Sequence, residues 1–253
     1  GVEKMSKMQC IGIEKKVHAF SLKPISFQME SGYLTGLIGV NGAGKSTLIR
    51  ILAGMEPEYE GEVMVDGMTL KDNYETVKQK IAVVSEDISF FKDKNALENG
   101  ELLGCYFEKF SMEEYYRWLD RLKLPKGQPI FQFSKGMYMK FQLAFAMSHE
   151  PEFLLLDEPT SGFDPVFRKD FMRILQEIRD RKIGILMSTH IISDIENIAD
   201  YVILIDGGEM KLNDTKEAFG NQTIQQMLEK YSVKRTRIGD LLKRKTVSDY
   251  DAS

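Results

Sequence analysis

Residues 39–47 have the types and spacing of a loop that binds a polyphosphate. They read Gly39, Val40, Asn41, Gly42, Ala43, Gly44, Lys45, Ser46 and Thr47, which fits the pattern GxxxxGK followed by Ser or Thr. Glycines let backbone N–H groups turn toward phosphate oxygens without Cβ clashes. Lys45 can reach the β- and γ-phosphates of a nucleotide, and the Ser46 hydroxyl can ligate Mg²⁺. The stretch therefore predicts a nucleotide-binding site that these residues line.

A second candidate site follows the apolar run at 153–156, where Asp157, Glu158 and Pro159 come next. The run predicts a buried strand, and ligands of open parallel sheets bind at the C-terminal ends of strands. Asp157 is placed to hold the Mg²⁺ hydration shell beside Ser46. Glu158, one residue further on, points elsewhere and can polarise the attacking water. Beside a phosphate-binding loop, this pattern favours nucleotide hydrolysis over a purely structural loop.

The elements that must position these motifs alternate between strands and helices. Residues 8–17 and 61–65 have β character, and buried apolar runs lie at 33–38, 81–84, 153–157, 183–188 and 201–205. Helical patterns fall between several of these runs, at 46–53, 166–181 and 191–199. The alternation predicts an α/β fold. We expect a P-loop NTPase core with a mostly parallel sheet and an N-terminal antiparallel β region.

The middle of the chain lacks a strand pattern. Helical patterns instead occupy 95–107, 111–122 and 134–148. An inserted all-helical subdomain is therefore expected within the core. The predicted boundaries are 1–86 and 151–212 for the core, 87–150 for the helical subdomain, and 213–253 for a C-terminal helical and basic tail.

Composition narrows the classes of protein that remain. The formal net charge of −4 over 253 residues gives no reason to expect a nucleic-acid partner. Cys10 and Cys105 stand far apart, which favours reduced thiols over a disulfide or a metal site. No apolar run approaches the roughly 18 residues that a membrane-spanning helix requires. Any role at a membrane is thus expected to come through a partner protein.

The order of the motifs resembles that of the ATP-binding subunit of an ABC transporter. The segment 157–165 reads DEPTSGFDP and resembles the acidic strand end and following loop of that family. Ser188-Thr189-His190 resembles its switch histidine, and the FSKGM sequence at 133–137 lies where its LSGGQ signature belongs. The resemblance covers about residues 8–212. Within the family it is closest to single-domain ATPases of bacterial exporters of bacitracin, lantibiotics and related peptides or drugs.

The resemblance implies an ATPase that needs ATP and Mg²⁺. Two subunits, identical or closely related, would pack head to tail around two ATP molecules. Each ATP would contact the Lys45 loop of one subunit and the signature residues Ser134, Lys135 and Gly136 of the other. His190 would contact the γ-phosphate and the attacking water, so that Glu158 and His190 form the catalytic pair.

Further nucleotide and protein contacts also follow from the resemblance. Asp164, in the loop after the acidic strand end, would belong to the nucleotide-binding residues. An aromatic residue near the first strand often stacks on adenine in this family. Phe20 is the candidate here, with packing in the core as the alternative. The subunit would lie in the cytoplasm at the inner face of the cell membrane, bound to a polytopic permease.

Two residues depart from the family pattern. Glu86 stands where the family usually has glutamine, after the strand at 81–84. A carboxylate can still ligate Mg²⁺, but it cannot donate a hydrogen bond when ionised. We therefore expect Glu86 to enter the Mg²⁺ sphere. Lys135 replaces the second glycine of the signature, where it either approaches the partner's nucleotide or points to solvent.

An alternative is a soluble ABC-type ATPase that acts on a ribosome or DNA. Translation factors of that kind usually carry two cassettes, and chromosome-organising relatives carry a long coiled coil between their nucleotide motifs. Neither feature is found here. A GTPase would need an NKxD motif at a strand end, and a kinase needs neither a signature nor a switch histidine.

We expect Phe90 and Phe91, in the connecting loop, to line an apolar groove for a short permease helix.

Overall fold

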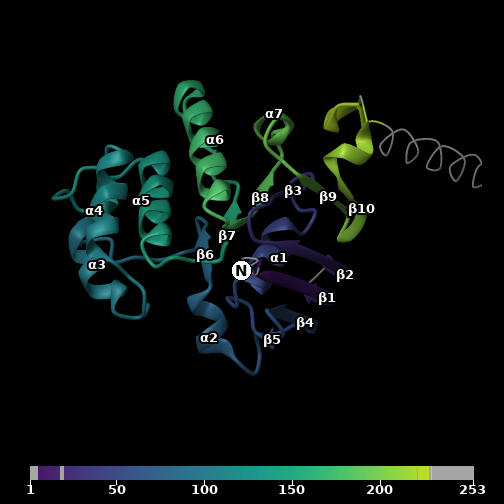
Figure 1. Ribbon diagram of the computed structural model, residues 1–253, viewed down its shortest axis with the longest axis horizontal. Coiled ribbons are helices and arrows are strands. Elements are labelled where there is room, and N and C mark those ends of the chain that lie inside the picture. Colours follow the sequence, from purple (N-terminus) through teal and green to yellow (C-terminus); the bar gives the residue numbers. More distant parts are fainter. Residues whose placement is uncertain (1–4, 18–19, 221, 228, 230–253) are drawn as a thin grey trace, which may run out of the picture. The chain divides into compact units, whose positions relative to one another are not determined.

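The computed structural model describes residues 5–17, 20–220, 222–227 and 229, and in this part of the chain a six-stranded sheet carries the predicted motifs (Figure 1). Its strand order is β10-β9-β3-β8-β7-β6. Neighbouring strands from β9 to β6 pair in parallel. The bounds are β3 Leu34–Ile38, β6 Ile81–Val84, β7 Phe153–Asp157, β8 Gly184–Thr189, β9 Tyr201–Asp206 and β10 Glu209–Thr215. The predicted α/β fold with a mostly parallel sheet is confirmed.

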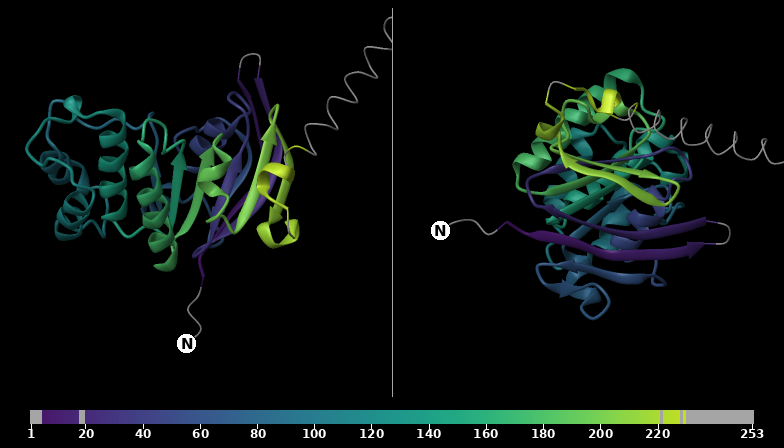
Figure 2. Two further views of the ribbon diagram at one scale, coloured as in Figure 1. Left: turned by 90° about the horizontal axis from the view of Figure 1, so that it is seen from above. Right: turned by 90° about the vertical axis from the view of Figure 1, so that its right-hand side faces the viewer.

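A second sheet has the order β2-β1-β4-β5, and its pairs are antiparallel (Figure 2). Its strands are β1 Lys7–Val17, β2 Phe20–Glu30, β4 Glu60–Val65 and β5 Met68–Thr69. The N-terminal antiparallel region was predicted, but β2 was missed. Pro24 interrupts its apolar alternation, so that Leu22 and Ile25 are buried three positions apart. Register shifts in the facing part of β1 accommodate this change.

Helix α1, Lys45–Leu52, joins the two sheets through one hydrophobic core. Its residues Leu48, Ile49, Ile51 and Leu52 are buried together with side chains from β1, β2, β4, β7 and β8. Helix α6, Pro165–Asp180, buries an apolar stripe that includes Phe171 and Leu175. Two shorter helices, α2 Tyr74–Gln79 and α7 Ile192–Ile195, complete the described helices of the core. The layers hold α1 and the strand ends in fixed positions around the predicted site.

The segment between β6 and β7 is helical and lies beyond the β6 edge of the large sheet (Figures 1 and 2). It contains α3 Ala96–Gly104, α4 Met112–Arg121, the short 3₁₀ helix η1 Ile130–Gln132 and α5 Lys135–Met147. Side chains of Asn95, Ser111 and Ser134 cap α3, α4 and α5 by accepting backbone N–H groups. The described part of the chain has no helix long and apolar enough to span a membrane.

The chain divides into two compact units, Gly1–Asp214 and Thr215–Ser253. Within the second unit, the 3₁₀ helix η2 spans Lys216–Phe219, and residues 224–227 are helical. The basic residues of the predicted tail lie outside the described residues: Lys234, Arg235, Arg237, Lys243, Arg244 and Lys245. The division of the first unit into a core and a helical subdomain stays an interpretation.

The buried His149 makes folding stability depend on pH. Its side chain follows α5, is 3% exposed and stacks on Phe107 with ring centroids 4.1 Å apart. Burial lowers its pKa to about 4, from an ordinary value of 6.5. The unfolded chain therefore binds the proton more readily between these two values, and the stability contributed by neutral His149 is lost as pH falls from 6.5 toward 4.

We expect this residue to contribute about 3 kcal/mol to the difference in unfolding free energy between pH 7 and pH 4. Denaturant unfolding at a series of pH values measures the effect. The variant His149→Gln cannot titrate in this range and should show a flatter pH profile. Identical profile shapes for the two proteins would contradict the assignment.

Candidate functional site

The phosphate-binding loop lies between the end of β3 and the start of α1, as its motif predicts. Gly42 and Gly44 have φ angles of 79° and 110°, which favour glycine. A Cβ on Gly44 would lie 2.8 Å from Cζ of Phe20, and one on Gly39 would lie 2.4 Å from the Ile205 carbonyl oxygen. The loop can therefore keep its backbone only with these glycines. Phe20 lies beside the loop and also packs against the core, so its stacking on adenine stays a prediction.

Lys45 is a buried cation at the base of this loop. Its side chain is 5% exposed, and Nζ donates to the carbonyl oxygens of Gly39 at 2.7 Å and Val40 at 3.3 Å. Nζ also lies 3.2 Å from Oε1 of Glu158. This ammonium lies at the first turn of α1, where the helix dipole also favours an anion. The exposed residues of the loop are Val40, Asn41, Gly42 and Ser46, while Ala43 is buried and Thr47 half-buried.

Asp157 and Ser188 face each other at the ends of the parallel strands β7 and β8. The Ser188 hydroxyl donates to Oδ1 of Asp157 at 2.6 Å and accepts from the backbone N–H of Glu158 at 2.9 Å. This hydroxyl orients the carboxylate that was predicted to hold Mg²⁺. Sequence reasoning found Ser188 only as part of the Ser-Thr-His motif and missed this bridging role, because the bridge depends on β7 and β8 being adjacent.

Glu158 connects Lys45 to His190. Its Oε2 lies 2.8 Å from Nδ1 of His190, while its buried Oε1 lies 3.2 Å from Nζ of Lys45 and has no other polar partner within the described residues. Its φ of 46° lies in the left-handed region, which costs a non-glycine residue roughly 1–2 kcal/mol. Such strain directs the side chain away from that of Asp157. The two adjacent acids thus have separate partners, as the sequence predicted.

The oxygen ligands present fit a Mg²⁺ ion that is shared with phosphate. Ser46 in α1 and Asp157 in β7 belong to elements that contact each other. The described residues include no group of three or more His, Cys, Asp or Glu side chains that could hold a metal ion. Mg²⁺ is commonly held by one or two carboxylates together with substrate phosphates. Bound ATP would supply those oxygens and the γ-phosphoryl group. The role of Glu158 as acceptor for the proton of an attacking water stays a prediction, and its Oε1 lies 3.2 Å from Nζ of Lys45.

The signature segment forms the N-terminus of α5. Ser134 is exposed, and its Oγ accepts the backbone N–H of Met137 at 3.2 Å. A Cβ on Gly136 would lie 3.2 Å from Cδ1 of Phe163, so close packing is one reason for this glycine. Asp164 caps α6, and its Oδ1 accepts two backbone N–H groups that lower its pKa. Nucleotide contacts by Ser134, Gly136 and Asp164 stay predictions.

The two departures from the family pattern are paired with each other. Nζ of Lys135 forms an ion pair with Oε1 of Glu86 and donates to Oγ of Ser161 at 2.9 Å. Glu86 follows β6, Lys135 begins α5, and Ser161 belongs to the loop after β7. In this structure the Lys135 side chain thus has partners within its own chain, rather than pointing freely to solvent. A Mg²⁺ ion at Glu86 would share its carboxylate with this exposed ion pair.

We expect Lys135 and Mg²⁺ to compete for the carboxylate of Glu86. Lys135→Met should lower the Mg²⁺ concentration at half-maximal ATP hydrolysis, and Glu86→Gln should raise it. Because an exposed pair contributes about 0.2–1 kcal/mol, the shift for Lys135→Met should not exceed roughly fivefold. The shift for Glu86→Gln should be the larger of the two, because that variant also loses the ligand. Mg²⁺ titrations of the steady-state rate measure both effects. Superimposable titrations of the parent and both variants would exclude Glu86 from the Mg²⁺ sphere.

The segment that carries Glu86 is held by contacts that the sequence did not predict. Its Ser85 N–H donates to Oε1 of the buried Gln142 in α5 at 2.9 Å. The buried Asn99 in α3 exchanges two hydrogen bonds with the backbone of Phe91. Arg50 in α1 pairs with Asp87 at 2.7 Å. The segment thus links α1 of the core to two helices of the helical segment, so its position depends on all three.

Comparison with known proteins places the chain in one family. The sequence profile described as ABC transporter matches residues 22–161. The linearmycin resistance ATP-binding protein LnrL of Bacillus subtilis (strain 168) is 32% identical over 219 residues, which cover 81% of this chain and 69% of that protein. The bacitracin transport ATP-binding protein BcrA of Bacillus licheniformis is 31% identical over 195 residues, which cover 75% and 63% of the two chains.

Solved structures agree with the sequence comparison. One described as the structure of the ATP binding subunit of an ABC transporter superposes with a TM-score of 0.79 and 26% identity. The match covers 89% of this chain and 99% of that one. The phosphate-binding loop follows β3, the two acids lie at the end of β7, and the histidine follows β8, so all three lie at the C-terminal ends of neighbouring parallel strands. The chain therefore belongs to the ABC transporter family, as an ATP-binding subunit that hydrolyses ATP.

Proposed function

We propose that this subunit powers an exporter of peptide, antibiotic or drug-like substrates from the cytoplasmic face of the membrane, bound to a polytopic permease. The linkage from Lys45 through Glu158 to His190 is the observation that carries the catalytic part. The class of substrate is supported by the relatives, whose names refer to linearmycin resistance and bacitracin transport. These relatives favour a transporter over a soluble ATPase that acts on a ribosome or DNA.

We infer that ATP binding pairs two subunits head to tail, and that Mg²⁺ assists hydrolysis. The exposed N-terminus of α5 supports the pairing. Ser134 there offers a hydroxyl and lies at a helix end that favours anions, which suits the γ-phosphate of an ATP bound to another subunit. The net negative charge of the chain does not favour a nucleic-acid partner.

An apolar cavity of about 320 Å³ is the proposed docking site for the permease. It lies where the core meets the helical segment. The residues that line this apolar cavity are Met55, Lys78, Ile81, Ala82, Val83, Asp87, Ile88, Ser89, Phe90, Phe107, Gln142, Phe145, Ala146 and His149. Its mostly apolar lining suits one face of a short amphipathic helix.

The expectation for the two neighbouring phenylalanines is met only in part. Phe90 lines the apolar cavity, but its ring also packs 4.7 Å from that of Phe141 and 5.2 Å from that of Phe145. Phe91 is 49% exposed and does not belong to the lining. Replacing Phe90 by serine would therefore disturb the core of the helical segment as well as the apolar cavity. A docking test needs a different residue.

Ser89 provides that test, because it is exposed and lines the apolar cavity. Ser89→Arg should fill the cavity with a bulky cation, whereas Ser89→Ala keeps it open. Each protein is purified from detergent-solubilised native membranes, and the captured permease is identified by mass spectrometry. Permease and subunit are then reconstituted in proteoliposomes for ATP-driven transport of candidate peptides.

We expect the parent and Ser89→Ala to retain the permease and support transport, and Ser89→Arg to lose both. Basal ATP hydrolysis by the isolated subunit should be the same in all three, because Ser89 contacts none of the catalytic residues described above. Equal permease recovery with Ser89→Arg would place docking elsewhere. Failure of the reconstituted complex to transport any peptide or antibiotic would reject the proposed substrate class.

A further inference from the structure

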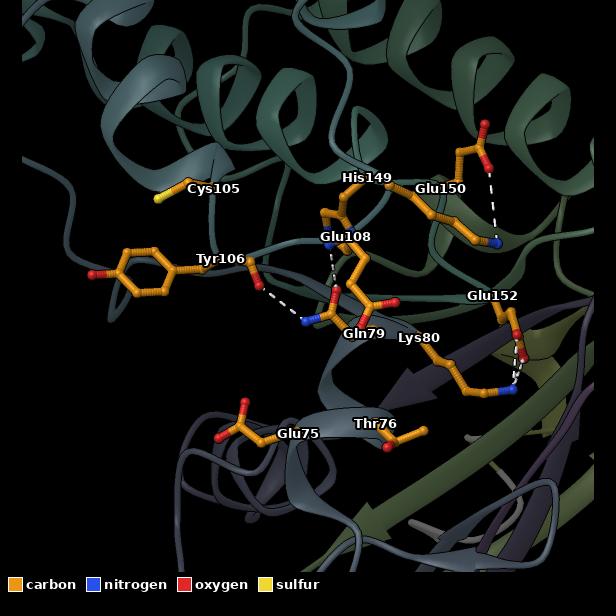
Figure 3. A pocket seen from close by; sticks show the side chains of 11 residues that line it. Glu75, Thr76, Gln79, Lys80, Cys105, Tyr106, Glu108, His149, Glu150 and Glu152 are labelled. Atoms are coloured by element: carbon orange, nitrogen blue, oxygen red, sulfur yellow. Dashed lines mark hydrogen bonds and ion pairs between the residues drawn. The ribbon is translucent and has the colours of Figure 1, made fainter.

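A second cavity, the polar cavity, has a volume of about 420 Å³. Figure 3 shows side chains that line it, and one of them, His149, also lines the apolar cavity. One wall comes from α2 and the residue after it, and the other from the segment after α3. Residues of the connection between α5 and β7 complete the lining. Gln79 joins these walls by donating to the Tyr106 carbonyl oxygen at 3.0 Å and accepting the Glu108 N–H at 2.9 Å. These two hydrogen bonds hold the two walls of the polar cavity together.

The charges around the polar cavity are unequal. Four glutamates and two lysines line it, and the lysines are already engaged: Lys80 with Glu152 at 2.9 Å and Lys109 with Glu150 at 3.9 Å. Glu75 and Glu108 are the remaining carboxylates. Both are exposed, and in the described part of the chain neither carboxylate has an ion-pair partner or a hydrogen-bond donor. The polar cavity therefore offers two unbalanced negative charges.

Two further features indicate a polar, planar ligand group. Nδ1 of the 97% buried His149 has no hydrogen-bond partner among the described residues, although buried nitrogens normally have one. Tyr106, which also lines the polar cavity, is 73% exposed. An aromatic ring exposed next to carboxylates is a surface on which a guanidinium can stack while it pairs with the acids.

We propose that the polar cavity binds an arginine side chain which the permease presents from its cytoplasmic surface, with Glu75 and Glu108 as the anionic partners. The inference rests on the proposed docking of the permease in the adjoining apolar cavity. Cytoplasmic loops of membrane proteins are rich in lysine and arginine, so such a partner has this group to offer. Arginine suits the polar cavity better than lysine, because its planar guanidinium has five N–H donors with which to pair with two acids and a flat face that can stack on an aromatic ring.

The first test uses N-acetyl-arginine methylamide as the probe, with the neutral citrulline analogue as its matched control. Both are titrated into the full chain while NMR follows the Tyr106 ring and the Glu108 amide. We expect the arginine compound to shift these signals and the citrulline compound to bind at least tenfold more weakly. The double variant Glu75→Gln/Glu108→Gln should lose the difference. Equal binding of the two compounds, no binding of either, or unchanged arginine binding by the double variant overturns the proposal.

The second test separates this inference from permease docking itself. The double variant and a control, Glu60→Gln/Glu62→Gln on β4, lose the same charge, but only the first loses it at the polar cavity. We expect about tenfold weaker permease binding at low salt for the first variant and parent-like binding for the control. If Ser89→Arg abolishes binding and the glutamate variant does not change it, docking stands and the arginine site is wrong.

Discussion

Replacing Glu158 with glutamine is expected to lower kcat for ATP hydrolysis about 10²–10⁴-fold while ATP binding is retained. The amide has the shape of the carboxylate but cannot accept the proton of the attacking water. The buried Oε1 lies 3.2 Å from Nζ of Lys45 and has no other polar partner within the described residues, so a lone pair remains to accept that proton. Because the variant removes a negative charge near the triphosphate, the affinity for ATP should not fall. Steady-state kinetics and nucleotide titration measure the two quantities separately.

A second consequence of Glu158→Gln is accumulation of ATP-bound dimer. Hydrolysis removes the γ-phosphate that the proposed head-to-tail pairing needs, so a subunit that cannot hydrolyse should remain paired. Size-exclusion chromatography with light scattering, with and without ATP, detects this change. Glu113→Gln is the matched control, because Glu113 is an exposed acid on α4. A kcat near that of the parent would show that Glu158 is not the general base.

Substitution of Lys45 by alanine is expected to have the opposite pattern, with binding affected first. Lys45 is the buried cation of the loop and donates to Gly39 and Val40. Charged hydrogen bonds contribute about 1.5–3 kcal/mol each, so loss of contacts to two phosphates should raise the Kd for ATP by roughly 10²-fold or more. Lys45→Met keeps most of the apolar part of the side chain, so comparing it with Lys45→Ala separates the effect of the lost charge from the effect of lost packing.

Fluorescent-nucleotide titration measures this Kd, and thermal unfolding without nucleotide checks the fold. Both variants leave the carboxylate of Glu158 without the cation that lies 3.2 Å away, so some loss of stability is also expected. Equal ATP affinity of the parent and Lys45→Met would mean that the ammonium does not contact phosphate. A loss confined to Lys45→Ala would assign the effect to packing of the stem.

The sequence alone determined the chemistry and most of its framework. The phosphate-binding loop and the acids Asp157 and Glu158 are read from consecutive residues, and their contexts require only a strand before each. The strands β6 and β7 match their predicted bounds, because buried parallel strands appear as uninterrupted apolar runs. The N-caps of α3, α4, α5 and α6 are likewise local, since each cap bonds to residues two or three positions ahead.

Regular elements whose patterns are weak or interrupted were missed or misjudged. β2 was missed at Pro24, and the polar α2 and β10 have no clear apolar period. The helix predicted over 191–199 is confined to Ile192–Ile195. The apolar residues of this stretch are spaced for burial and do not form one continuous helix. Ile195 packs closely against β3, because a Cβ on Gly36 would lie 2.5 Å from its Cδ1. After Ile195 the chain turns toward β9.

Only the tertiary structure decided which side chains act together. Ser188 bridges Asp157 and Glu158 because β7 and β8 are neighbours in the sheet, although they are far apart in the chain. The ion pair between Glu86 and Lys135 arises where β6 ends beside α5. Residue types and local spacing set what each group can do, but distances of a few ångströms between remote segments depend on how the sheets and helices pack. Those distances determine which partner each group has.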